Sequence, residues 1–174
     1  MKLSSKMERC GLSPMRKFNP YADKVKERGI KIYHLNIGQP DVETPEPFFD
    51  ALRSYADKVV SYAPSAGMPV YLDAVRGYFK RIGVELTRDE ILATSGGSEA
   101  LQMVFATILD DGDEVIIPEP FYPNYATSVT LAGASVHPIP TRVEEGYFYA
   151  DRARVEACIN EHTRAINLQD NLSY

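Results

Sequence analysis

The sequence has 174 residues, with 19 basic and 24 acidic side chains and a formal net charge of −5. This length fits about one domain, and a composition of 44 % hydrophobic and 25 % charged residues excludes a disordered chain. The acidic balance argues against nucleic-acid binding, and the lack of an apolar run of ~20 residues argues against a membrane span.

Turn and cap residues divide the first half of the chain into short segments with apolar residues at regular spacing. Proline near the start of a helix and glycine at its end are a common combination, and Pro20 and Gly29 bracket the first segment. Thr44 is expected to cap a second helix, and Gly83 to end a third. The predicted elements are a helix over residues 19–29, a strand over 30–36, and helices over 44–59 and 69–82.

In the second half of the chain, short apolar runs alternate with segments of helical spacing. We expect strands over residues 91–94, 114–117, 134–139 and 164–168, separated by helices over 98–109, 122–132 and 151–161. Strands that alternate with helices of ~10 residues are typical of βαβ units, a parallel sheet and right-handed crossovers. The predicted fold class is therefore α/β, with three α/β/α layers around a mostly parallel sheet. A mixed α+β layout is the less favoured alternative.

Two glycines and a serine, Gly96, Gly97 and Ser98, stand between a predicted strand and the helix after it, and we call them the glycine turn. The first amides of a helix have no intrahelical partner and its dipole is positive there, so such a turn can bind a phosphate group. The Ser98 hydroxyl would add a donor. Glycines in such turns are often only structural, and on this motif alone that alternative is favoured. No Gly-Lys-Ser/Thr follows, so the segment is not a P-loop.

An aromatic loop, residues 118–125, follows the next predicted strand and contains Phe121, Tyr122 and Tyr125. In a doubly wound sheet, ligands bind beyond the carboxyl ends of the strands. We therefore expect this loop beside the glycine turn, where an aromatic ring could stack on a flat heterocycle. On spacing alone, the alternative that these rings only pack the loop is favoured.

The residues that form metal sites do not cluster in the sequence. The three histidines have no ligand spacing, and the acidic run over residues 110–113 is interpreted as a turn into a strand, so no metal site is expected. Cys10 and Cys158 are too few for a disulfide framework, and Cys158 is expected to pack in a core. No apolar stretch follows the charges of the first ten residues, so we expect no signal peptide and a cytoplasmic protein.

Two further segments, residues 35–45 and 61–72, are rich in glycine, proline and polar residues. In order and spacing, these segments, the glycine turn and the aromatic loop together resemble the class I and II aminotransferases, pyridoxal-phosphate enzymes of fold type I. The resemblance covers residues 13–166. It implies a transferase that moves an amino group between an α-amino acid and a 2-oxo acid, with pyridoxal 5'-phosphate as its cofactor.

The resemblance assigns cofactor contacts to residues that match the family's motifs. It implies that Gly96, Gly97 and Ser98 hold the cofactor phosphate and that Tyr122 stacks on the pyridine ring. It also implies that Tyr62 reaches the cofactor phosphate of a neighbouring subunit. A homodimer is therefore expected.

The same resemblance implies a substrate contact and a division into domains. Ile37 and Gly38 match the segment that closes over the substrate carboxylate. Residues 1–45 match the N-terminal arm and small-domain segment, and residues 46–174 match the N-terminal part of the large cofactor-binding domain. Small-molecule substrates are expected, and neither nucleic acid nor a membrane is.

The sequence departs from the family's pattern after Ile166. The family continues into an Asn-Pro-x-Asn-Pro-x-Gly loop, whereas residues 167–174 read Asn-Leu-Gln-Asp-Asn-Leu-Ser-Tyr. None of the eight lysines has the Ser-x-x-Lys context of the family's cofactor-binding lysine. We therefore expect the N-terminal part of an aminotransferase, with no catalytic residue of its own and no activity alone. The alternatives are a non-catalytic fragment that acts only by association, and a lyase or decarboxylase with the same cofactor.

Overall fold

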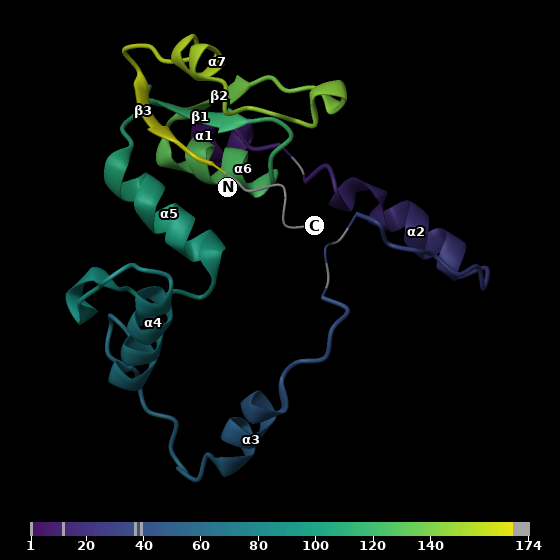
Figure 1. The fold of residues 1–174 in the computed structure, drawn as a ribbon. Helices are drawn as coiled ribbons and strands as arrows, with labels where there is room; N and C mark the ends of the chain where they lie inside the picture. The colour runs from purple at the N-terminus through teal and green to yellow at the C-terminus, as the bar shows by residue number, and fades with distance from the viewer. Residues whose placement is uncertain (1, 12, 37, 39, 169–174) are drawn as a thin grey trace. The chain divides into compact units, whose positions relative to one another are not determined.

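The computed structural model describes residues 2–11, 13–36, 38 and 40–168. The α-helices are α1 (Ser5–Arg9), α2 (Asn19–Lys26), α3 (Glu46–Ser54), α4 (Pro69–Arg81), α5 (Gly97–Ile108), α6 (Asn124–Ala132) and α7 (Arg152–Glu156). The 3-10 helices are η1 (Arg16–Phe18), η2 (Arg88–Glu90) and η3 (Val143–Glu145). The strands are β1 (Glu114–Pro118), β2 (Ser135–Ile139) and β3 (Thr163–Ile166) (Figure 1). Within the described ranges, no helix has the length and apolarity needed to cross a membrane.

β1 is the central strand of a small parallel sheet with the order β2-β1-β3. In the register of β1 and β2, Glu114 lies opposite Ser135 and Pro118 lies opposite Ile139. The pairing of β1 with β3 has a register shift after Glu114. The strands predicted at these three places are confirmed, and so is the parallel sheet.

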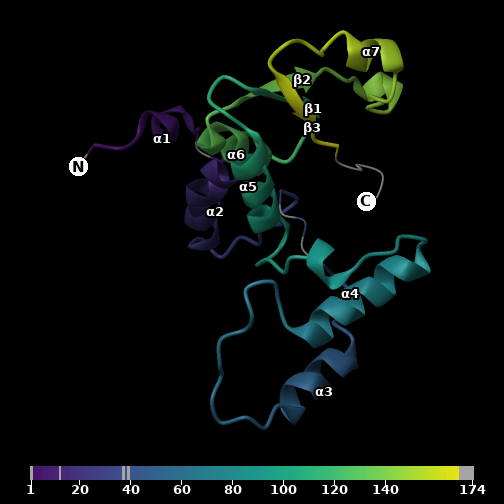
Figure 2. The same cartoon turned by 90° about the vertical axis from the view of Figure 1, so that its left-hand side faces the viewer.

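Side chains of β1 alternate between the two faces of the sheet and build a core on each. The core cluster shared with α5 and α6 consists of Phe105, Leu109, Val115, Ile117, Val129 and Ala134. The opposite cluster consists of Ile116, Ile139 and Cys158, with Val155 of α7 packed against it. Figures 1 and 2 show the same division, with α5 and α6 on one face and α7 on the other. The three-layer α/β/α fold is confirmed, and Cys158 packs as predicted.

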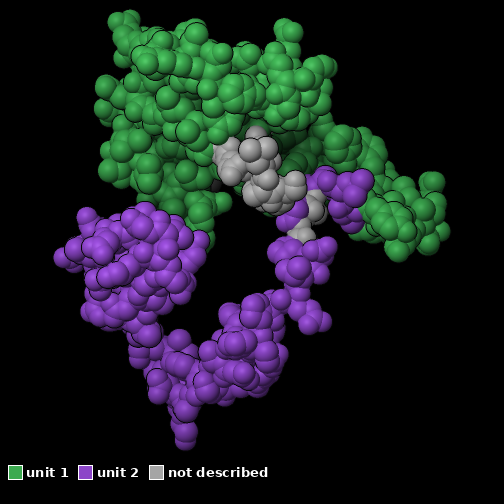
Figure 3. Space-filling view, in the orientation of Figure 1, with its two compact units in different colours: residues 1–33, 95–174 green, residues 34–94 purple. Residues whose placement is uncertain are grey.

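The chain divides into two compact units, residues 1–33 with 95–174 and residues 34–94 (Figure 3). The first unit contains the sheet and both core clusters. In the second unit, Gly67 and Leu72 are the buried residues among those that the structure describes. Each fully buried Val or Ile contributes roughly 1.5–3 kcal/mol, so apolar burial stabilises the first unit far more than the second.

Two of the predicted strands, residues 30–36 and 91–94, are not strands in the structure. The described strands all belong to the sheet β2-β1-β3, and neither segment joins it. Without a neighbouring strand, the backbone groups of an extended segment must find other partners. The Ala93 N–H, for example, donates to the carbonyl of Ala66 at 2.9 Å. The strand predictions for residues 30–36 and 91–94 were wrong because they rested only on the local apolar character of the two segments.

Several predicted helix ends also need correction. α3 begins after Pro45, which has no side-chain cap hydrogen bond, so Thr44 is not the cap. The same helix ends at Ser54 instead of residue 59, because Tyr55 and Val59 are exposed and no packing stabilises a longer helix. α7 ends at Glu156 instead of residue 161. Its predicted cap is confirmed, since Asp151 accepts a hydrogen bond from the Arg154 N–H at 3.0 Å.

Candidate functional site

The amino-terminal end of α5 is a turn without a side-chain cap. Gly96 is its N-cap residue, with a φ of +85° and no side-chain cap hydrogen bond. A φ in that range strains any residue that has a Cβ, so this position requires glycine. α5 spans 12 residues, so the turn lies at the positive dipole end of a full helix, where the first amides have no partner within the helix.

The glycine turn has the space and the donors that a phosphate group needs. Gly96, Gly97 and Ser98 are all exposed. A Cβ placed on Gly96 or Gly97 would meet no atom within 4 Å, so an anion could approach the helix amides closely. The Ser98 hydroxyl supplies a further hydrogen-bond donor. The residues present therefore fit the phosphate of pyridoxal phosphate.

Glu99, in the first turn of α5, is a part of this site that the resemblance does not predict. Its carboxylate accepts a hydrogen bond from the Ser95 backbone N–H. A carboxylate is favoured at this end of a helix by the dipole. The contact ties the residue before the glycine turn to the helix after it. The one signal in the sequence was a glutamate in the first turn of a predicted helix.

Tyr122 lies in the loop between β1 and α6 and is partly exposed, at 38 % of its surface. Its hydroxyl accepts a hydrogen bond from the Asn124 side-chain amide at 2.9 Å, and its ring makes a T-shaped contact with the Tyr125 ring, with the centroids 5.6 Å apart. Phe121 and Tyr125, like Leu101 of α5, pack against the core cluster that contains Phe105. The packing interpretation is therefore correct for Phe121 and Tyr125, whereas Tyr122 is partly exposed.

The other residues assigned by the resemblance belong to residues 34–94. Gly38 is exposed, and Tyr62 is fully exposed. Ile37 lies outside the described residues. The roles predicted for these three residues stay predictions.

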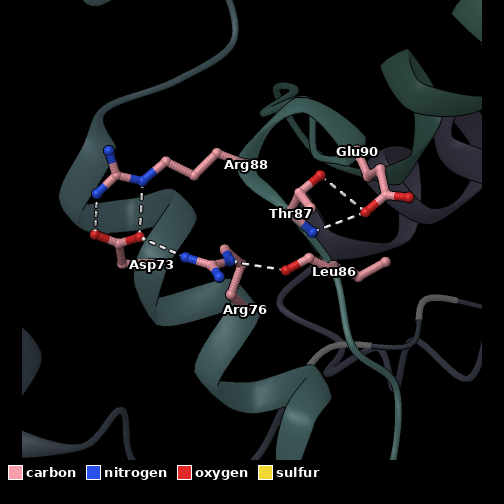
Figure 4. A network of polar contacts seen from close by, with 6 residues as sticks. All are labelled: Asp73, Arg76, Leu86, Thr87, Arg88 and Glu90. Carbon is pink, nitrogen blue, oxygen red and sulfur yellow. Dashed lines mark hydrogen bonds and ion pairs between the residues drawn. The ribbon is translucent and has the colours of Figure 1, made fainter.

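A network of polar contacts joins α4 to the segment after it (Figure 4). The Arg88 guanidinium makes two hydrogen bonds to the Asp73 carboxylate, one of them from Nε at 2.8 Å. This interaction holds the pKa of the Asp73 carboxyl below its usual range. Arg76 Nε donates to the carbonyl of Leu86 at 2.8 Å. These contacts hold η2 on α4 and so fix the start of the segment that leads to the glycine turn.

A second polar cluster lies at the amino-terminal end of β1. The Asn160 side chain donates to the Glu114 carboxylate at 2.7 Å, and His137 Nδ1 lies 3.2 Å from it. Asp113 accepts from the Asp110 N–H at 2.8 Å and from Arg164 Nε at 3.0 Å. The acidic run is thus a turn into a strand, as predicted. In the part of the chain that the structure describes, no three His, Cys, Asp or Glu side chains form a group that could hold a metal ion.

Comparison with known proteins decides the family. A family model described as aminotransferase class I and II matches residues 30–167. The chain belongs to this family. The prediction made from the four sequence segments is therefore confirmed at the level of the family and of its α/β fold.

The individual relatives that this chain matches are also named as aminotransferases. It is 39 % identical over 150 residues to a protein of Thermus aquaticus named probable aspartate/prephenate aminotransferase, covering 85 % of this chain and 39 % of that protein. It is 37 % identical over 140 residues to an LL-diaminopimelate aminotransferase of Desulforudis audaxviator, covering 78 % of this chain and 35 % of the relative. The chain spans about two-fifths of the length of the curated relatives it matches.

Solved structures show the same similarity in three dimensions. An aspartate aminotransferase mutant of Thermus thermophilus superposes with a TM-score of 0.88 at 35 % identity. The match covers 95 % of this chain and 44 % of that protein.

Proposed function

We propose that these residues form the phosphate-binding part of a pyridoxal-phosphate-dependent aminotransferase. The observation that carries the proposal is the glycine turn at the start of α5, where Gly96 has a φ of +85° and no side chain caps the helix. The turn supplies amide donors, a hydroxyl and open space at one point. The family match over residues 30–167 supports the assignment of that turn to the cofactor phosphate.

In this proposal the chain binds and orients the cofactor. When bound, pyridoxal phosphate supplies an electron sink for the chemistry at the amino-acid Cα. The amides after Gly96 and the Ser98 hydroxyl hold the phosphate, and the ring of the partly exposed Tyr122 packs on the pyridine. Gly38, together with Ile37, contacts the substrate carboxylate. The division at residues 45 and 46, between a small-domain segment and the large domain, belongs to the same proposal.

The proposed protein is a cytoplasmic homodimer that acts on an α-amino acid and a 2-oxo acid. The full exposure of Tyr62 supports the dimer, because a tyrosine without packing partners in its own chain is free to reach a second copy. The two cysteines are both free thiols, which suits a reducing compartment. Amino-acid biosynthesis is the process that the names of the two relatives favour.

We further propose that a longer protein carries these residues. The matched relatives are more than twice as long as the matched region. The eight lysines of this chain also lack the family's Ser-x-x-Lys context. Activity is therefore to be measured on the full-length protein.

The test is amino transfer by the full-length protein loaded with pyridoxal phosphate. Aspartate or LL-diaminopimelate labelled with ¹⁵N would be incubated with 2-oxoglutarate, and the products analysed by mass spectrometry. We expect ¹⁵N in newly formed glutamate and a 2-oxo acid from the donor. Release of carbon dioxide or of an elimination product, without labelled glutamate, would instead show a decarboxylase or a lyase.

A further inference from the structure

Gly67 is held in an unusually tight contact inside the unit of residues 34–94. It is buried and has a φ of +120°. A Cβ at this position would lie 2.8 Å from the Cβ of Ala93 and 3.3 Å from Cδ2 of Leu72. Carbon atoms in contact lie about 3.5–4.0 Å apart, so neither neighbour leaves room for a side chain here.

A backbone hydrogen bond lies directly beside this contact. The N–H of Ala93 donates to the carbonyl of Ala66 at 2.9 Å. The Gly67 N–H donates to the carbonyl of Pro64, also at 2.9 Å, which closes the turn before it. We call the Ala66–Ala93 hydrogen bond and the Gly67–Ala93 contact the clasp.

The two sides of the clasp lead to two parts of the proposed cofactor site. Tyr62 precedes Ala66 by four residues, and Gly96 follows Ala93 by three. α4 begins at Pro69, directly after the first side, and η2 ends just before the second. The Asp73–Arg88 pair holds η2 on α4 (Figure 4). The element after the first side of the clasp and the element before the second are therefore joined to each other.

We propose that Gly67 is a positioning residue: its contact with Ala93 fixes the loop that carries Tyr62 relative to the segment that leads into the glycine turn. The inference rests on the proposed function, in which Tyr62 of one copy and the glycine turn of another hold the same phosphate. In that function, the clasp sets the position of the loop whose Tyr62 each copy offers to the cofactor of its partner. A side chain at residue 67 would separate the two segments and displace Tyr62.

The chain offers a matched control and a rescue. Gly67→Ala introduces both the steric contact and a strained φ. Gly83→Ala introduces a strained φ of +85° in the same unit, but with no atom within 4 Å of the new Cβ. Ala93→Gly removes the atom that a side chain at residue 67 would meet, so the double variant restores space on one side of the clasp.

The first measurement is hydrogen exchange of the Ala93 amide in the full-length protein, with amides of β1 as the internal reference. In Gly67→Ala we expect exchange at Ala93 to rise about tenfold, with exchange in β1 unchanged. Gly83→Ala should leave Ala93 unchanged, and Gly67→Ala with Ala93→Gly should recover most of the protection. The proposal would be overturned if the exchange rate of the Ala93 amide were unchanged in Gly67→Ala. It would also be overturned if that rate rose equally in Gly67→Ala and Gly83→Ala.

The second measurement is the dissociation constant of pyridoxal phosphate in the Tyr62 and Tyr62→Phe backgrounds. Gly67→Ala should weaken binding about tenfold when Tyr62 is present and change little when it is absent, the non-additivity expected of residues that act together. Equal weakening in both backgrounds would show a purely structural role and overturn the proposal. If Tyr62→Phe alone leaves cofactor affinity unchanged, the dimeric site of the proposed function fails, and the exchange at Ala93 still decides whether the clasp exists.

Discussion

Ser98 is the residue of the glycine turn whose contribution can be removed without touching the backbone. Ser98→Ala in the full-length protein should cost one hydrogen bond to a charged group, worth ~1.5–3 kcal/mol. The dissociation constant of pyridoxal phosphate should therefore rise about ten- to a hundredfold. Fluorescence or absorbance titration measures this. An unchanged constant would remove Ser98 from the site.

Gly97 allows a complementary test of the space beside the helix amides. Because no atom lies within 4 Å of a Cβ built at this position, Gly97→Leu should fold normally and yet occupy the volume that the phosphate needs. We expect loss of cofactor binding with little change in melting temperature. Gln102→Leu, on an exposed position further along α5, is the matched control and should bind normally. Normal binding by Gly97→Leu would contradict the proposed position of the phosphate.

The proposed site gives Tyr122 a role that needs its ring, and the structure shows its hydroxyl in a hydrogen bond with Asn124. Tyr122→Phe keeps the ring and loses the hydrogen bond with Asn124, whereas Tyr122→Ala loses both. If the ring packs on the cofactor, Tyr122→Ala should change the absorption spectrum of the bound cofactor and speed its loss, and Tyr122→Phe should do neither. Identical spectra and release rates in both variants would leave Tyr122 a packing residue.

At the level of elements, the polar cluster before β1 predicts a loss of stability in acid. The hydrogen bond from Asn160, and then that from His137, hold the pKa of the Glu114 carboxyl below its usual range. The Asp110 amide, and then Arg164, do the same for the pKa of Asp113. A carboxyl group whose pKa is lower in the folded state than in the unfolded state stabilises the fold at a pH above its unfolded pKa. This stabilisation is lost as the pH falls through the pKa of the folded state.

The free energy of unfolding of the chain should therefore fall as the pH drops below about 4. Urea denaturation followed by circular dichroism from pH 7 to about pH 3 measures this dependence. Glu114→Gln should reduce the dependence on pH, and Glu144→Gln, at an exposed position in η3, should not. Equal pH profiles for Glu114→Gln and the unmodified chain would contradict the role of the cluster.

The elements also show what the sequence could and could not predict. The strands near residues 115, 137 and 165 were predicted from local apolar runs, and they are strands in the structure because each run pairs with another in the sheet. The runs over residues 30–36 and 91–94 have the same local character, but no strand of the described residues pairs with them. Pairing is a property of distant segments, so local pattern cannot reveal it.

The same limit applies to the site. The glycine turn could be located because strand, glycine and helix signals are adjacent in sequence. The contact of Glu99 with Ser95 depends on a side-chain direction, and the contact of Gly67 with Ala93 joins residues far apart in the chain. The position of Glu99 in the first turn of a predicted helix was the one sequence signal for its contact, and the contact of Gly67 with Ala93 had none.

At the level of the whole molecule, the uneven burial of the two units predicts where proteases act first. Tyr55 and Tyr62 are exposed within residues 34–94, whereas Phe105 is buried and Phe121 and Tyr125 pack against the core of the other unit. Brief chymotrypsin digestion of the chain should cut after Tyr55 or Tyr62 before any cut after Phe105. Mass spectrometry of early products identifies the order. First cuts at Phe105 or Phe121 would contradict the assignment of the stable core.

The position of the phosphate can be measured directly by following backbone amides in an NMR titration of the ¹⁵N-labelled full-length protein with pyridoxal phosphate. Binding at the glycine turn predicts that the largest shifts fall on the amides of Gly96, Gly97 and Ser98. It also predicts that Ser98→Ala needs more cofactor to reach the same shifts. Saturable shifts centred on other residues, with the amides of the glycine turn unmoved, would contradict the account.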